Sequence, residues 1–115
     1  MSQHLDALAV GQARRIEIAR IRGEVRRDPY RVRDLLLDPP PALTNLTVLD
    51  VLRMPLKHGT ATPVLSRIGR RAAAARISLL EPMGSPSSRR AREWAVEHGL
   101  WHVCRRLPGA VRRTA

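Results

Sequence analysis

The fold is decided by residues 46–69, LTVLDVLRMPLKHGTATPVLSRIG, which predict two helices joined by a short turn. Thr47 and Asp50 have the spacing of a capping box, in which each side chain bonds the backbone N–H of the other residue. The first helix therefore begins after Thr47 and runs through residues 48–53. Pro55 stops it, because proline lacks the N–H that would continue the hydrogen-bond ladder.

The second helix is predicted to begin after the turn of residues 55–60. Thr62 followed by Pro63 is a typical helix start, with an N-cap residue and then proline at the first helical position. Apolar residues at helical spacing continue to Gly69. Residues 70–80 contain four consecutive alanines, and they either extend this helix past Gly69 or form a separate piece.

The junction of these two helices has the chemistry of an anion-binding site. A helix N-terminus presents unpaired backbone N–H groups and the positive end of the helix dipole. Lys57 adds a charge to the turn, and Thr60 and Thr62 add hydroxyl donors. For a nucleic-acid duplex, the bound anion is a backbone phosphate. The alternative is an ordinary helical hairpin between core helices, and the local sequence leaves it open.

Upstream of this module, residues 4–27 predict one long helix because no proline interrupts them. Ile18, Ile21 and Val25 form one apolar face at helical spacing. The same helix carries a second apolar stripe, which consists of Leu5, Leu8, Ile16 and Ala19. Two stripes are more than a small core needs, so the first turns of the helix are expected to dock loosely.

A further helix is predicted from Asp28 and Pro29, with the aspartate as N-cap and the proline at the first helical position. Val32, Leu35 and Leu36 give it an apolar face, and the run of prolines at 39–41 ends it.

Downstream, residues 81–88 hold two prolines, one glycine and three serines, which predicts a loop. A last helix is expected over residues 89–98, with Trp94 directed inward and Gly99 as its C-cap. Residues 101–115 are then expected to be a basic tail. The fold class is all-α: a long N-terminal helix at 1–27, a compact helical domain at 28–100 with the two-helix module at 47–69, and the tail.

Charge is the strongest functional signal in the sequence. The 115 residues carry 21 basic and 10 acidic side chains, a net charge of +11. The excess is concentrated in the second half, and no acid occurs between Asp50 and Glu81. A solvated surface would mix the two signs, so this half predicts contact with a polyanion. All but one of the 21 cations are arginine, whose planar fork suits phosphate.

The stretch from Leu46 to Trp94 resembles the core of the actinobacterial integration host factor family. The matching pattern is an apolar helix ending in Met54-Pro55, a turn to Gly59 and a basic helix from Thr60 to Ile68. Later positions match at Arg76-Ile77, at Leu80 and at the basic run Arg89-Arg90-Ala91-Arg92. The sequence departs from the family in a turn one residue longer, in His58 before the glycine, and in a longer loop at 81–88.

The resemblance implies a helix-two-turn-helix, nucleoid-associated protein. Such a protein grips the backbone across the minor groove of double-stranded DNA, bends or compacts it, and shows little sequence preference. Combined with the charge pattern, the expected DNA contacts are Lys57, His58, Gly59, Thr60, Thr62, Arg53, Arg67, Arg70, Arg71, Arg76, Arg20, Arg22, Arg26, Arg27, Arg89 and Arg90.

Two other functions remain open at this point. A basic ribosomal protein carries the same module, so an RNA- or ribosome-associated role is one alternative. A regulator whose long first helix docks on a protein partner is the other. We expect a monomer or weak self-association on DNA.

Enzymatic chemistry and bound cofactors are not expected. No serine or cysteine lies in a nucleophile motif, and the chain lacks the N-terminal Pro-Glu pair of glycosylases that share the module. His98, His102 and Cys104 lack a second cysteine pair, and Gly99 is expected to end the helix between the histidines, so no zinc site is predicted. A single cysteine and the lack of a long apolar run favour a cytoplasmic, nucleoid location without a membrane span.

Overall fold

The structure is a computed structural model that describes residues 2–56 and 58–104, with side chains described at 7–56 and 59–103. All-α architecture is confirmed, since the described residues form helices and a single isolated bridge between Thr47 and Pro82. In chain order the elements are α1 (Ser2–Arg27), α2 (Arg31–Leu37), the 3-10 turn η1 (Pro41–Leu43), α3 (Val48–Arg53), α4 (His58–Ala74), α5 (Ser88–Trp94), the π-helical turn η2 (Ala95–Gly99) and α6 (Leu100–Cys104).

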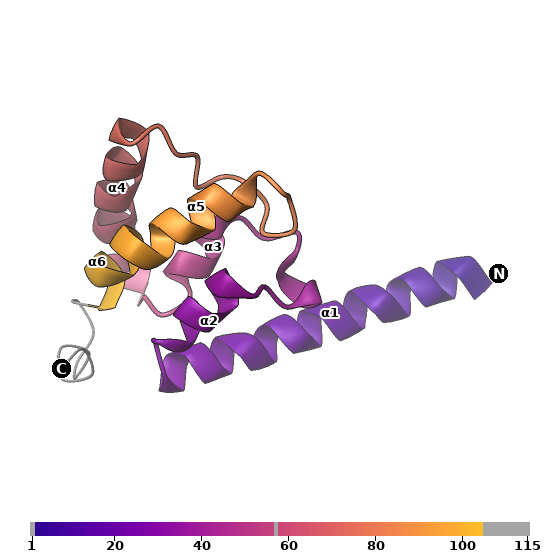
Figure 1. Cartoon of the computed structure of the whole chain (residues 1–115). Helices are drawn as coiled ribbons and strands as arrows, with labels where there is room; N and C mark the ends of the chain where they lie inside the picture. The colour runs from indigo at the N-terminus through magenta and orange to yellow at the C-terminus, as the bar shows by residue number, and fades with distance from the viewer. Residues whose placement is uncertain (1, 57, 105–115) are drawn as a thin grey trace.

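Only the second half of α1 joins the core. Ile21 and Val25 are buried, and Ile18 packs against them from the rim. The first half extends away from the body of the molecule (Figure 1). Leu8 and Ile16, which belong to the second apolar stripe, are 48% and 71% exposed. This arrangement agrees with the expected loose docking of the first turns.

Helix α2 begins at Arg31, two residues later than predicted. The N–H of Arg31 donates to the carbonyl of Asp28 at 3.0 Å, so residues 28–30 form a tight turn ahead of the helix. The Asp28 carboxylate still accepts from the N–H of Tyr30 at 3.3 Å. The predicted cap therefore exists, but it supports the turn that leads into α2.

Helix α3 is confirmed together with its cap. The Thr47 hydroxyl accepts from the N–H of Asp50, and the Asp50 carboxylate accepts from the N–H of Thr47, both at 3.1 Å. Val48, Val51 and Leu52 are fully buried, so one face of this short helix forms the centre of the core.

The predicted start of α4 at Thr62 and Pro63 is wrong. The helix begins at His58, and Pro63 lies inside it, in the second turn. Proline is tolerated there because it removes one hydrogen bond, the one to the Gly59 carbonyl, close to a helix end where such bonds are already missing. The turn between α3 and α4 is shorter than expected as a result.

The open question about residues 70–80 is settled in favour of continuation, since α4 passes Gly69 and ends at Ala74. Its end has the hydrogen bonds of a Schellman motif: Arg76 N–H to the Ala73 carbonyl at 3.0 Å, and Ile77 N–H to the Ala72 carbonyl at 2.9 Å. Arg76 adopts the left-handed conformation that this motif requires, with φ 60°.

The segment after α4 returns along the N-terminal side of α3. Backbone hydrogen bonds join Val48 N–H to the Glu81 carbonyl at 3.1 Å and Met83 N–H to the Leu46 carbonyl at 2.8 Å. At Gly84 the two backbones approach so closely that a Cβ atom would lie 2.8 Å from the Thr44 Cβ. This contact requires glycine.

The predicted helix end at Gly99 and tail from residue 101 are both wrong. Helical structure runs without a break from Ser88 through Gly99 to Cys104. Gly99 is buried, and a Cβ there would lie 3.4 Å from Leu52, so the glycine lets this helix pack closely on α3. Val103 is fully buried as well. The predicted basic tail beyond Cys104 lies outside the described residues.

Among the described helices, none has the length and apolar character needed to cross a bilayer.

Candidate nucleic-acid interface

Three arginines from two helices meet around one hollow of ≈ 320 Å³. We call it the arginine hollow; its lining residues are Arg22, Arg26, Asp50, Arg53, Met54, Leu56 and Ala61. Arg22 and Arg26 are one turn apart on α1, and Arg53 is the last residue of α3. Ala61 belongs to the first turn of α4. The hollow therefore lies where α1, α3 and the beginning of α4 come together.

The three arginines of this hollow form no ion pair within the described residues. Within residues 7–56 and 59–103, none of them has a carboxylate within ion-pair distance. Asp50 also lines the hollow; its carboxylate accepts the N–H of Thr47 in the capping box and keeps its negative charge, so the lining holds three guanidinium groups and one carboxylate. Guanidinium groups that converge on a hollow with a net positive charge attract a phosphate group.

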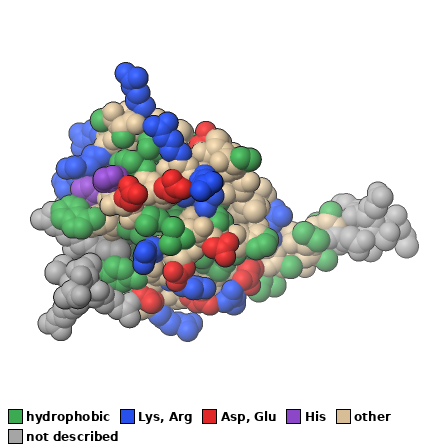
Figure 2. All heavy atoms as spheres, in the orientation of Figure 1, with side chains coloured by type: hydrophobic (Ala, Val, Ile, Leu, Met, Phe, Trp, Pro, Cys, Tyr) green, Lys and Arg blue, Asp and Glu red, His purple; other side chains and the backbone are tan. Residues whose placement is uncertain are grey.

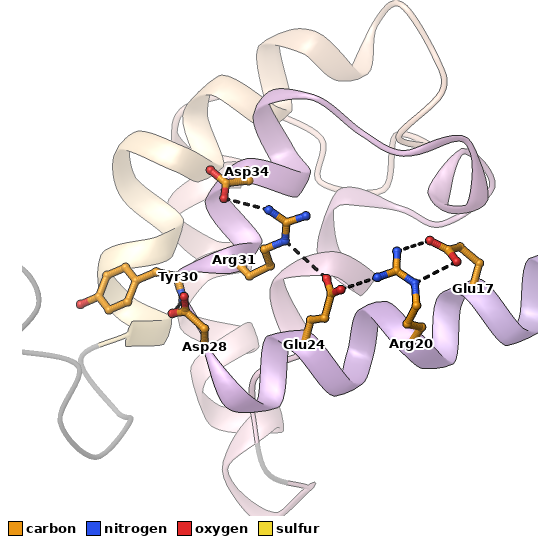
Figure 3. Close-up of polar contacts among 7 residues, drawn as sticks. All are labelled: Glu17, Arg20, Glu24, Asp28, Tyr30, Arg31 and Asp34. Atoms are coloured by element: carbon orange, nitrogen blue, oxygen red, sulfur yellow. Dashed lines mark hydrogen bonds and ion pairs between the residues drawn. The ribbon is translucent and has the colours of Figure 1, made fainter.

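Acidic side chains are instead paired on another side of α1. Arg20 bonds both Glu17 and Glu24, and Arg31 joins Glu24 to Asp34 (Figure 3). The hydrogen bond from Arg20 lowers the pKa of the Glu17 carboxyl, so this carboxylate stays ionised well into the acidic range. Arg20 is therefore held in ion pairs, whereas Arg22 and Arg26 form none within the described residues.

The start of α4 contributes backbone donors beside the hollow. The first N–H groups of a helix have no partner inside it, and the helix dipole makes this end positive. Gly59 and Thr60 are exposed, and a Cβ built on Gly59 would meet nothing within 4 Å. The side of the first turn that carries Gly59 is therefore exposed at the surface.

The outer face of α4 continues the positive surface. The helix contains no acid, and Arg67, Arg70 and Arg71 are exposed on it without an ion-pair partner in the described part of the chain. Figure 2 shows basic side chains gathered at the edge that α4 forms, with histidines beside them. On the same face, acidic side chains lie beside the histidines and across the middle of the molecule.

The other predicted contacts do not join the arginine hollow. Arg27 lines a separate hollow with Glu24, Asp28 and Arg31. Arg89 pairs with Glu93 on α5. Thr62, Arg76 and Arg90 are exposed elsewhere on the surface, Lys57 lies outside the described residues, and the side chain of His58 is not described.

A second hollow, of ≈ 300 Å³, was missed by the sequence analysis. We call it the tryptophan hollow; it is lined by Arg71, Trp94, Glu97, His98, Trp101 and His102. Apart from Arg71, these residues follow the i, i+3, i+4, i+7, i+8 spacing of one helix face. That pattern was available in the sequence, but the predicted helix end at Gly99 divided it. Among the described residues, no three His, Cys, Asp or Glu side chains are arranged so that they could hold a metal ion, Glu97, His98 and His102 of this hollow included.

Comparison with known proteins found no matching family model, no matching curated protein and no matching solved structure.

Proposed function

We propose that this protein binds double-stranded DNA through its sugar-phosphate backbone, with little sequence preference. The observation that carries the proposal is the convergence of Arg22, Arg26 and Arg53, which form no ion pair within the described residues, beside the first turn of α4. A phosphate in the arginine hollow accepts hydrogen bonds from guanidinium groups, and the first turn of α4 adds backbone donors.

The arrangement favours a long polyanion over a small anionic ligand. Beyond the hollow, exposed Arg67, Arg70 and Arg71 extend the positive surface along α4, which offers contacts to further phosphates of the same strand or its neighbour. Contacts of this type position a duplex without recognising bases. We therefore propose a non-enzymatic, nucleoid-associated role in bending or compacting DNA across the minor groove, as the resemblance to the integration host factor family implies.

The test is a fluorescence-anisotropy titration with unrelated duplexes at increasing salt. If about six phosphates are neutralised, the affinity falls roughly 10³-fold between 50 and 200 mM salt. The double variant Arg22→Glu, Arg53→Glu should weaken binding by about 10-fold or more. The slope of log affinity against log salt concentration should become shallower, by the amount expected for about two fewer neutralised phosphates. The double variant Arg15→Glu, Arg33→Glu is the charge-matched control, because both side chains are also exposed and neither lines the hollow.

Structured RNA serves as the competitor at matched salt. Preferential binding of RNA would replace the DNA proposal by the RNA-associated alternative. Equal loss of affinity in the control and the double variant would show that net charge alone, and not the arginine hollow, holds the duplex.

A further inference from the structure

Both tryptophans of the chain line one hollow, although they come from different helical segments. The chain has two Trp, one Tyr and no Phe, so the tryptophan hollow gathers most of its aromatic side chains. The Trp94 ring lies 5.5 Å from the His98 ring, and the Trp101 ring lies 5.0 Å from the His102 ring. Trp101 is 55% exposed, which is unusual for the largest apolar side chain.

The continuous helix from Ser88 to Cys104 changes from α-helical to π-helical winding at this hollow. Residues of η2 form a π-helical turn, and Glu97 and His98 belong to it. Single π-helical turns inside longer helices occur often at functional sites. Here the turn lies between Trp94 at the end of α5 and Trp101 in α6, so it sets the relative position of the two indole rings.

The opposite wall of the hollow is provided by the basic helix α4. Arg71 lines the hollow from α4, and Arg67 and Arg70 are exposed on the same helix. The hollow thus combines flat aromatic rings with a cation and one carboxylate, Glu97. Indole and imidazole rings stack on nucleobases of any sequence, Arg71 can hold the attached phosphate, and the Glu97 carboxylate can accept from a base amine or imide.

We propose that the tryptophan hollow receives an unpaired nucleobase of the nucleic acid held by the arginines of α4. This inference rests on the proposed function, and it adds a preference for DNA with a bulged or unpaired nucleotide. A volume of ≈ 300 Å³ is at the lower end of the range of small-ligand pockets, about 300–1,000 Å³, which suits a single base. A duplex offers no exposed base face, so intact DNA leaves the hollow empty.

Intrinsic fluorescence gives a direct test, because both tryptophans line the hollow and no other indole contributes. The full chain is titrated with a matched duplex and with the same duplex carrying a single thymidine bulge. The bulged duplex should quench the emission and bind about 5- to 150-fold more tightly, the range expected for one stacked base. The matched duplex should bind without quenching.

Variants separate stacking from general effects. Trp101→Ala should remove the preference for the bulged duplex and leave the affinity for the matched duplex unchanged. Trp101→Phe should keep part of the preference for the bulged duplex, because a phenyl ring can still stack. Leu80→Ala is the control, since Leu80 is 68% exposed and lies in the segment after α4, outside the hollow. Folding of each variant is checked by circular dichroism.

Three results would overturn the inference. Equal affinity for the two duplexes without quenching would exclude base insertion, while leaving backbone binding intact. A bulge preference that survives in Trp101→Ala without quenching would place recognition outside the hollow. Binding to neither duplex would refute the proposed function together with this inference, and the exposed Trp101 would then point to a protein partner.

Discussion

Replacing Arg76 by glycine should make the protein more stable and leave its binding to DNA nearly unchanged. Arg76 occupies the left-handed position that ends α4, with φ 60°. For a residue with a Cβ, this conformation costs roughly 1–2 kcal/mol. Glycine adopts it freely but loses about 0.4–1 kcal/mol through the greater freedom of its unfolded chain. Taking the middle of each range, the net gain is about 0.8 kcal/mol.

The hydrogen bonds of the motif do not depend on the side chain of Arg76. They join backbone atoms of Arg76 and Ala73, and of Ile77 and Ala72. Ala72 is buried and Ile77 packs against the core, which supplies the apolar contact that accompanies such a helix end. The substitution therefore removes backbone strain and one exposed cation and leaves this packing in place.

Thermal unfolding and duplex binding are measured on Arg76→Gly and Arg76→Ala together. Both variants lose the charge, but only glycine relieves the strain, so Arg76→Gly should unfold about 2–6 °C above Arg76→Ala. Both should bind the duplex nearly as tightly as the parent chain, because Arg76 lies outside the arginine hollow. Equal melting temperatures would refute the strain argument, and a large loss of affinity in both would extend the interface to Arg76.

Three further substitutions test the packing that positions the site, each by urea or thermal unfolding. Gly84→Ala should lower the free energy of unfolding by about 1–3 kcal/mol, because its Cβ would lie 2.8 Å from the Thr44 Cβ. Gly69→Ala, whose Cβ would meet nothing within 4 Å, should raise it by about 0.5–1 kcal/mol. Similar effects at both glycines would contradict the close approach at Gly84. Arg92→Ala should lower the free energy of unfolding by about 1–3 kcal/mol, since this side chain donates to the Leu36 carbonyl at 2.8 Å and to the buried Ser88 hydroxyl at 3.1 Å. Arg90→Ala is the control, because Arg90 is exposed, and it should change stability by less than about 0.5 kcal/mol. An equal loss in both variants would argue against the role of Arg92. Thr47→Ala should cost about 0.5–2 kcal/mol through loss of the capping box, and an unchanged midpoint would show that the cap contributes nothing to α3.

The sequence predicts those features whose cause is local. The capping box of Thr47 and Asp50 involves residues three apart, so it is visible in the sequence and confirmed in the structure. The buried face of α1 at Ile21 and Val25 follows from helical spacing in the same way. Local signals therefore identify α3, the long first helix and the all-α class.

Errors arise where local preference and tertiary packing compete. Thr62 and Pro63 have the local features of a helix start, but the helix that packs Val64 and Ile68 into the core begins earlier, at His58. Gly99 was expected to end a helix, whereas its missing side chain serves the contact with Leu52. The helical spacing that continues from Trp94 to His102 indicates the second use, but the local preference of glycine for a helix end outweighed it, and the error concealed the tryptophan hollow.

The same apolar spacing that docks α1 also builds the arginine hollow. Arg22 and Arg26 each follow a buried residue, Ile21 and Val25, and one residue is about 100° of rotation around a helix. Burial of the two apolar side chains thus fixes the direction of both arginines, toward the side where α3 presents Arg53. The long helix consequently acts as part of the binding site. Removal of the residues before residue 18 should leave the affinity for a duplex nearly unchanged. Val25→Ala should reduce both the stability of the protein and its affinity for a duplex. Loss of affinity only in the shortened chain would instead assign the DNA contact to the projecting half of α1.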